Sequence, residues 1–322
     1  MPSIVTHHYF AKDVFEELPR EIKNSFNSSL DIYYLFAQSF DNLFYYKFFT
    51  PWQGREIRKL GTKAQQTKVN LYFKNILNEI TNQDLKNNSE VLAYLYGSIC
   101  HYCLDSTAHP FIIYESGHID ADKKYRGNHE KVEVTIDAYI YEKKERKPLR
   151  KENLANQLLP KKIFPKPLKE VLTNVYKSTF HFQNMAEIYE KSIHTGNFLL
   201  NHFVTDRTGF KKILYTIKDT LSFESKRKYA NLSFHVTKIQ EEYLNKNHTP
   251  WHHPVTNEIH HDSFEDLYNQ ALQKAKVLIT EIHTYLHSNH KDIKQLLQII
   301  GNLSYATGLD CNQKKPLSYF KY

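Results

Sequence analysis

Apolar residues recur three and four positions apart along most of the chain, which is the spacing of one face of an α-helix. The stripe is clearest in residues 55–80, where Ile57, Leu60 and Ala64 begin a pattern that continues to Ile80 and predicts one or two helices. The pattern also predicts helices, joined by turns at 50–54 and 249–254, in residues 11–18, 29–49, 91–109, 128–142, 168–202, 210–219, 226–246 and 263–289. No strand or internal repeat stands out, so the predicted fold is all-α.

Two of these predicted helices carry polar residues at one-turn spacing inside otherwise apolar sequence. His101, Asp105 and His109 are four residues apart, so on a helix they project from the same face. Pro110 follows directly and predicts the end of that helix, because proline cannot continue the hydrogen-bond ladder.

The second helix repeats this spacing with His129, Glu133 and Asp137, and Asn128 is the predicted N-cap. Nitrogen and oxygen ligands on two neighbouring helices are what a divalent metal site in a helical scaffold requires. The spacing therefore predicts a metal site between these two helices.

The composition agrees with a single helical domain over residues 1–322. Of the 322 residues 41% are hydrophobic and only nine are glycine, which argues against a glycine-rich nucleotide-binding fold or an all-β fold. We expect a metal-ligand core in 1–142, an exposed proline- and lysine-rich loop at about 143–167, and C-terminal helices in 168–322. The three cysteines make no disulfide framework, and we interpret the C-x-x-C of Cys100 and Cys103 as core packing, with a zinc knuckle or redox pair as the alternative.

The formal charge of +8 comes from scattered basic residues, densest at 143–151 and 225–228. A solvated helix end and loop is our interpretation of these runs, and attraction to a phosphate-bearing substrate or to an anionic membrane is the alternative. No basic-then-apolar leader and no run of 18 apolar residues is found, so we expect a cytoplasmic protein, with unconventional export as the alternative.

Further ligand candidates lie early in the chain. His7 is one, with His8 as its alternate. Asp41 stands among Phe40, Leu43 and Phe44, where a carboxylate is costly to bury unless it is paired or coordinates a metal. A solvent-facing aspartate at a helix start is the other interpretation of Asp41. The histidines at 252, 253, 260 and 261 lack a fixed spacing and are less convincing as a metal cluster.

The chain resembles the zinc-dependent phospholipase C family, an all-α fold shared with the fungal single-strand nucleases. The resemblance rests on MPSIVTHHYF for His7, QSFDNLFYY for Asp41, GSICHYCLDSTAHPF for the first helical triplet and HEKVE for the second. It implies a multi-helix bundle with a cluster of up to three zinc ions in a cleft between helices.

The resemblance also implies which residues hold each ion. One zinc would be held by His109, His129 and Glu133, and a second by Asp41, His101 and Asp105. The third would be held by His7, by the amine and carbonyl of Pro2, and by Asp105 as a bridge. Asp137 would orient a ligand imidazole.

The chain departs from the family at one ligand. The family has a further histidine between the aspartate and the H-x-x-x-D, but no histidine lies between His8 and His101 here. Gln65 stands where that ligand would be, with Thr62 as the other candidate. An amide is a poor zinc ligand, so we expect one to three ions.

The implied reaction is hydrolysis of a phospholipid, or of another phosphodiester, by metal-activated water. Asp41 would orient or deprotonate that water, or would serve only as a ligand. The alternatives are nuclease activity on a single-stranded nucleic acid and a degenerate, non-catalytic metal-binding protein.

Overall fold

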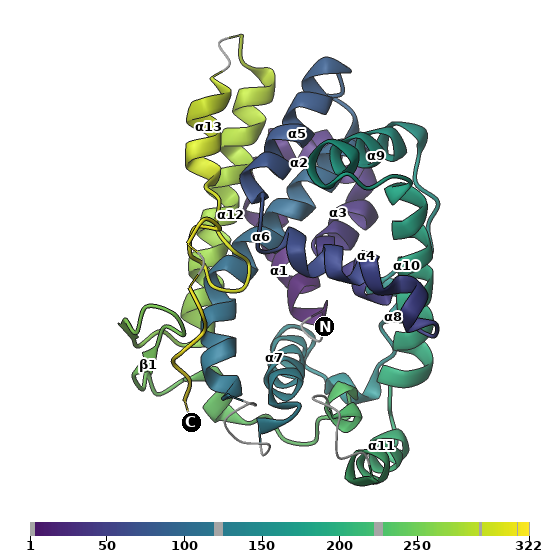
Figure 1. Ribbon diagram of the computed structural model, residues 1–322, viewed down its shortest axis with the longest axis vertical. Helices are drawn as coiled ribbons and strands as arrows, with labels where there is room; N and C mark the ends of the chain where they lie inside the picture. The colour runs from purple at the N-terminus through teal and green to yellow at the C-terminus, as the bar shows by residue number, and fades with distance from the viewer. Residues whose placement is uncertain (1–3, 119–124, 222–227, 290–291, 314, 322) are drawn as a thin grey trace.

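The computed structural model describes residues 4–118, 125–221, 228–289, 292–313 and 315–321. In these ranges the chain forms thirteen α-helices, several short 3-10 turns and a two-stranded hairpin, which confirms the all-α fold (Figure 1). The helices are α1 (Ile4–Glu17), α2 (Arg20–Phe26), α3 (Leu30–Phe36), α4 (Pro51–Ala64), α5 (Val69–Asn82), α6 (Ser89–Ser116), α7 (Asn128–Glu145), α8 (Ala155–Leu158), α9 (Lys166–Phe180), α10 (Met185–Leu199), α11 (Phe210–Leu221), α12 (Phe264–His287) and α13 (Ile293–Ile300).

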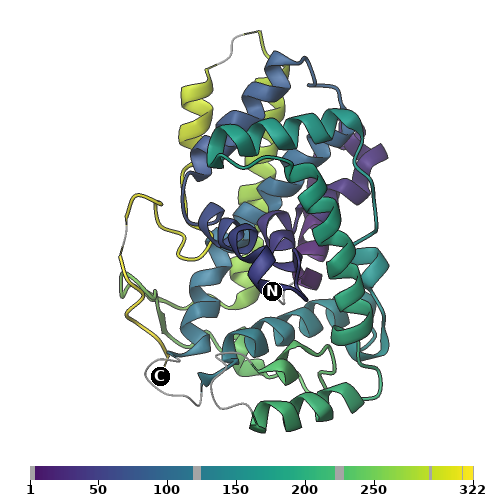
Figure 2. The same cartoon turned by 45° about the vertical axis from the view of Figure 1, so that its right-hand side comes forward.

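Helix α6 is the central element, and helices from both ends of the chain pack around it. It contacts α1, α2, α3, α7, α9 and α12, and it runs down the middle of the molecule in Figures 1 and 2. Most of its side chains are buried, as expected for a helix that is apolar on all sides. Its tyrosines bond to their surroundings: Tyr94 pairs with the Tyr72 hydroxyl at 2.7 Å, and Tyr102 donates to the Ile300 carbonyl at 2.8 Å.

The predicted end of this helix at Pro110 is wrong, because α6 continues through the proline to Ser116. Pro110 has no N–H for the carbonyl of Ser106. The backbone of Gly308 packs against that carbonyl, where a Cβ on residue 308 would lie only 2.5 Å from the oxygen. The extra turns bring Ser116 beside α7.

The segment predicted as an exposed loop is instead partly built into the core. Helix α7 extends to Glu145, and the residues after it form the turn η4 (Leu149–Lys151) and helix α8. The apolar residues of this segment are buried: Leu149, Leu154, Leu158, Leu159 and Phe164. Lysines and prolines dominate the composition here, but the leucines between them decide the packing.

Several other boundaries differ from the sequence predictions. Helix α4 begins at Pro51 inside the predicted turn, since proline is well suited to the first helical position. The predicted helix over 226–246 is irregular where it is described, with only the short turns η6 (Tyr229–Leu232) and η7 (Glu241–Leu244). The predicted turn at 249–254 includes β1 (Trp251–His252), which pairs antiparallel with β2 (Ile259–His260). Helix α12 begins with a capping box formed by Ser263 and Asp266.

Candidate metal centre

The polar faces of α6 and α7 meet the start of α1 and the turn η2 (Ser39–Tyr45) in the lower half of the molecule (Figure 1). This arrangement brings together residues that are widely separated in sequence. Two groups within the described ranges have ligand atoms within 4.8 Å of one another: His109, His129 and Glu133 form the first, and His7, His101 and Asp105 form the second.

The first group joins one residue of α6 to two of α7. His109 Nε2 lies 3.5 Å from His129 Nε2, and Glu133 Oε1 lies 3.3 Å from His129 Nε2 and 3.8 Å from His109 Nε2. Burial alone would raise the pKa of Glu133, but nearby positive charge, that of the chain's amino group first and then that of the His129 and His109 imidazoles, holds this pKa below its ordinary value. The side chain of His129 is 38% exposed, so this group is open to solvent on one side.

Ser116 orients His129, and the sequence predictions missed it. Its hydroxyl donates to the Ile112 carbonyl at 2.6 Å, so a lone pair of the same oxygen faces His129 Nδ1 at 3.1 Å. The Nδ1 atom of His129 therefore carries the proton in the neutral ring. Nε2 is left free to act as a ligand, because the hydrogen bond at one ring nitrogen sets the tautomer. The signal in the sequence is weak: Ser116 lies two helical turns after His109, on the same face.

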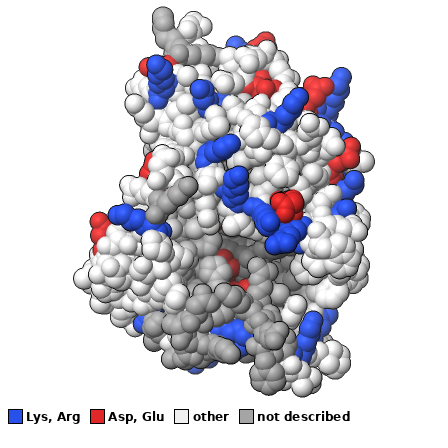
Figure 3. Space-filling model, viewed as in Figure 1, with Lys and Arg blue, Asp and Glu red and all other residues white. Residues whose placement is uncertain are grey.

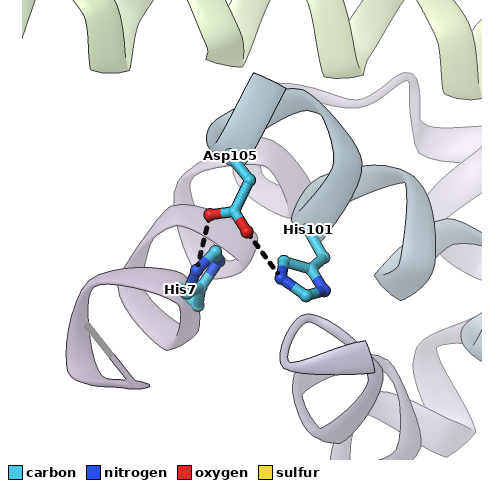
Figure 4. Close-up of side chains that lie close together, drawn as sticks. All are labelled: His7, His101 and Asp105. Atoms are coloured by element: carbon cyan, nitrogen blue, oxygen red, sulfur yellow. Dashed lines mark hydrogen bonds and ion pairs between the residues drawn. The ribbon is translucent and has the colours of Figure 1, made fainter. Parts of the chain in front are cut away.

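In the second group, the carboxylate of Asp105 bridges two imidazoles (Figure 4). Asp105 Oδ1 lies 3.2 Å from His7 Nε2, and Oδ2 lies 2.9 Å from His101 Nε2. Burial would raise the pKa of Asp105, yet His101 and His7 hold this pKa well below its ordinary value. Asp105 Oδ2 also lies 3.7 Å from His109 Nδ1, which connects the second group to the first.

Asp41 and Gln65 stand at the edge of the second group. Asp41 Oδ2 lies 3.8 Å from His101 Nε2, and the Asp41 side chain is 21% exposed. The Gln65 amide donates to Asp41 Oδ1 at 2.6 Å. The structure thus brings Gln65 against Asp41, where a histidine in its place would present a ring nitrogen to the same group. Thr62 has no described contact with these residues, and Pro2 lies outside the described residues.

The structure corrects one predicted role beside the ligands and gives a second residue, Asp137, a role in holding α1. Asn128 is the first residue of α7 and does not cap it; its amide donates to the Ser116 carbonyl at 2.9 Å and ties the start of α7 to the end of α6. The side chain of Asp137 lies against the start of α1. Its carboxylate accepts hydrogen bonds from the Thr6 N–H at 2.8 Å, the Thr6 hydroxyl at 2.6 Å and the Val5 N–H at 3.3 Å. Free N–H groups at a helix start attract a carboxylate, so Asp137 caps α1 and fixes the turn that carries His7.

A family model described as zinc dependent phospholipase C matches residues 6–186, which is 181 of the 322 residues and includes both groups of the metal centre and Asp41. The chain belongs to the zinc-dependent phospholipase C family. No curated protein and no solved structure matches it. Helices α11, α12 and α13 lie after the matched range.

The ligand atoms of both groups in this zinc-dependent phospholipase C family member suit a zinc ion. Zinc–nitrogen bonds of about 2.1 Å in a tetrahedron place neighbouring ligand atoms about 3.4 Å apart, and the three separations in the first group run from 3.3 to 3.8 Å. In the second group, the ligand nitrogens of His7 and His101 converge on one carboxylate. Both donor sets are the imidazole and carboxylate chemistry that zinc prefers.

The other candidate ligands take no part in this centre. Cys100 and Cys103 are buried and unbonded to each other, burial raises the pKa of both thiols, and the sulfur of Cys100 contacts the Tyr33 hydroxyl at 3.0 Å. His8 is buried and accepts a hydrogen bond from the Gln157 amide. The histidines of the β1–β2 hairpin bond separately, as His253 does to the Thr307 carbonyl at 2.9 Å, and form no metal-type group in the described residues.

The metal centre lies near a hollow in the face of the molecule shown in Figure 3, where acidic side chains are visible on the floor and basic side chains line the upper edge. Such a charge distribution suits cations on the floor and an anionic substrate above them. No helix in the described ranges is long and apolar enough to cross a bilayer.

Proposed function

We propose that the protein is a zinc-dependent phosphodiester hydrolase that cleaves phospholipids between glycerol and phosphate. The observation that carries this proposal is the first group, in which three ligand atoms from two helices lie 3.3 to 3.8 Å apart. A closed structural zinc site has four protein ligands, whereas this group has three and an exposed side, as hydrolytic zinc sites do. Family membership supplies the phospholipid as substrate class.

Each residue has a defined task in this reaction. His109, His129 and Glu133 would hold one ion from the protein side, and Asp105 would link it to further ions at His7, His101 and Asp41. Zinc in such a site lowers the pKa of a water to about 7 and offsets the charge that builds on phosphoryl oxygens. Asp41 is the candidate base, because its carboxylate is the partly exposed one beside His101 and Gln65 holds only one of its two oxygens.

A chelator assay tests the activity directly. The zinc-loaded protein should hydrolyse p-nitrophenylphosphorylcholine and a short-chain phospholipid, and a chelator should abolish both activities. Single-stranded DNA serves as the third substrate, because preferential cleavage of DNA would assign the centre to the nuclease alternative. Zinc-loaded protein that cleaves none of the three would support the non-catalytic alternative.

The number of ions depends on the contact between Gln65 and Asp41. The Gln65 amide nitrogen donates to Asp41 and has no lone pair for a metal, and its amide oxygen is a poor zinc ligand beside imidazole or carboxylate, so we expect fewer than three ions in the native protein. Gln65→His should raise the zinc content by one ion per chain and should increase turnover. Gln66→His, one position along and outside the group, is the matched control, and an equal rise in both variants would contradict this placement of Gln65.

A further inference from the structure

In helix α11 the apolar side chains are exposed, which is the reverse of an ordinary surface helix. Its only buried side chain is that of Asp219, whereas its apolar side chains face outward. The exposed fractions of these apolar residues are Phe210 63%, Ile213 60%, Leu214 47%, Ile217 53% and Leu221 77%. Their spacing of three, four, seven and eleven places them along one face, so α11 presents a continuous apolar stripe outward.

Five aromatic residues from two other segments extend this stripe. They come from residues 48–52, which lead into α4, and from residues 198–203, which include the end of α10 and the turn after it. All five are exposed: Phe48 40%, Phe49 56%, Trp52 72%, Phe198 41% and Phe203 41%. Phe49 stands 5.9 Å from Phe198 and 6.0 Å from Phe203 between ring centres. The Tyr215 hydroxyl of α11 donates to the Phe203 carbonyl at 3.0 Å and holds the two parts together. We call these five residues and the five of α11 the apolar rim.

The exposed large apolar residues of the described ranges are concentrated in the apolar rim. Among the seventeen large apolar residues exposed in the described ranges, ten belong to it and the other seven lie in other segments of the chain. Single exposed apolar side chains are ordinary, but a large contiguous patch marks an interaction site.

The charges around α11 have one sign at the surface. Asp206 and Asp219 are buried and accept backbone N–H groups, Asp206 from Gly209 and Lys212, and Asp219 from Tyr229 and Ala230. The cations of the described segment lie at the surface or partly buried: Arg207, Lys211, Lys212, Lys218 and Lys228. An apolar helix face with basic flanks, and with no exposed carboxylate among the described residues of 205–221 and 228–232, matches an anionic lipid surface.

The elements that carry the apolar rim lie beside the hollow. In Figure 1 the start of α4, the lower end of α10 and α11 follow one another down the right edge, and Figure 2 brings this edge forward. Side chains that are neither basic nor acidic form the right-hand side of the hollow in Figure 3.

We infer that the apolar rim is a membrane-docking surface that holds the hollow against anionic phospholipid bilayers. The stripe of α11 would lie in the plane of the interface with its lysines at the headgroups, as amphipathic helices do. The inference builds on the proposed function, because it states how a bilayer substrate would be presented to the centre. Docking itself requires neither zinc nor hydrolysis.

Trp52 is a natural reporter for this surface. The chain has two tryptophans; Trp52 is 72% exposed and Trp251 only 3%. In chelator, adding vesicles of phosphatidylcholine with phosphatidylserine should shift the tryptophan emission to the blue, and Trp52→Phe should remove the shift. Vesicles of phosphatidylcholine alone should bind more weakly, and added salt should release the protein from the anionic vesicles.

Matched variants test the surface by co-sedimentation with the same vesicles. Ile213→Ser/Ile217→Ser should weaken binding at least about tenfold, since two apolar side chains no longer enter the interface. Lys218→Glu should weaken binding to anionic vesicles by about fivefold or more. Val277→Ser/Ile299→Ser changes two exposed apolar residues outside the apolar rim and should bind as the native protein does. Circular dichroism checks that each variant is folded.

Equal binding by the native protein and the Ile213→Ser/Ile217→Ser variant would overturn the inference, and so would absence of binding to either kind of vesicle. A concentration-dependent dimer that this variant abolishes would assign the surface to a second copy of the chain. Hydrolysis of soluble p-nitrophenylphosphorylcholine separates this inference from the proposed function. A variant that loses vesicle binding should keep its activity on p-nitrophenylphosphorylcholine. If the native protein binds vesicles but does not hydrolyse this substrate, the docking inference stands and the proposed function fails.

Discussion

At the scale of single residues, the imidazoles of the metal centre depend on groups that do not contact a metal. The Ser116 hydroxyl accepts a hydrogen bond from His129 Nδ1. The carboxylate of Asp105 lies within 4 Å of ring nitrogens of His7, His101 and His109. These contacts turn ring nitrogens toward a common point before any ion binds. Preorganisation of this kind lowers the cost of ordering the ligands on binding.

Ser116→Ala should therefore weaken zinc binding by about 10- to 100-fold, because the His129 ring loses the acceptor that fixes its tautomer and orientation. Competition with a chromogenic chelator measures this affinity. Ser106→Ala is the matched control, since Ser106 lies on the same helix and donates to a carbonyl in the same way, to Tyr102 at 2.6 Å, but contacts no ligand imidazole. Equal losses in the two variants would refute the role of Ser116.

His8, the neighbour of a ligand, should make the protein sensitive to acid. Burial, helped by Lys12, lowers the pKa of His8 to about 3, so below pH 6.5 the unfolded chain binds a proton that the native imidazole does not. The free energy of unfolding should fall by about 2 kcal/mol between pH 7 and 5 from this residue alone.

Urea unfolding of the native protein and of His8→Asn, both in chelator, tests this at the two pH values. The variant should lose about 2 kcal/mol less than the native protein over that interval. Identical pH dependence in the two proteins would show that folding does not lower the pKa of His8.

At the scale of elements, one helix start holds the second group in place. Asp137 of α7 caps α1 through Val5 and Thr6, and His7 is the next residue. The cap thus couples the stability of α1 to the position of a ligand.

Asp137→Ala should lower the free energy of unfolding by about 1–2 kcal/mol, as loss of a helix cap does, and should also reduce zinc content because His7 loses its fixed position. Ser263→Ala removes the cap of α12 away from the centre, so it should cost a similar amount of stability and leave zinc content unchanged. Denaturant unfolding together with elemental analysis measures both quantities. An unchanged zinc content in Asp137→Ala would refute the coupling.

The helices also show which structural features can be predicted from the sequence. The i, i+4 spacing of His101, Asp105 and His109 predicts a shared face because helix geometry alone places them there. The Asp137 cap was not predictable, since its donors lie 131 and 132 residues away and only the packing of α1 on α7 brings them together. The continuation of α6 past Pro110 was also not predictable, because the backbone that packs against the freed Ser106 carbonyl is that of Gly308, about 200 residues further along the chain.

At the scale of the whole molecule, the metal centre joins α1, α6, α7 and η2, so bound zinc links segments from residue 7 to residue 133. The family resemblance in the sequence identified the fold and the ligand candidates. It did not reveal the outward apolar face of α11, because helical periodicity predicts an apolar stripe without saying which side of it faces the protein.

Zinc should raise the stability of the whole domain, since an ion that binds only the folded state stabilises it by mass action. At a free zinc concentration about 1,000 times the dissociation constant, the gain is about 4 kcal/mol. Scanning calorimetry with zinc and with chelator should show a higher unfolding temperature with zinc. The His129→Asn/Glu133→Gln variant should show a smaller difference, and an equal difference in both proteins would place the stabilising ion elsewhere.

The most direct test of the account is the zinc content of the purified chain after dialysis, measured by elemental analysis. The native protein should retain at least one zinc per chain. The His129→Asn/Glu133→Gln variant should lose that ion, while His252→Asn/His261→Asn, which changes histidines of the hairpin region, should retain it. A native protein without zinc, or a variant at positions 129 and 133 with the native zinc content, would contradict the assignment of His109, His129 and Glu133 as the metal centre.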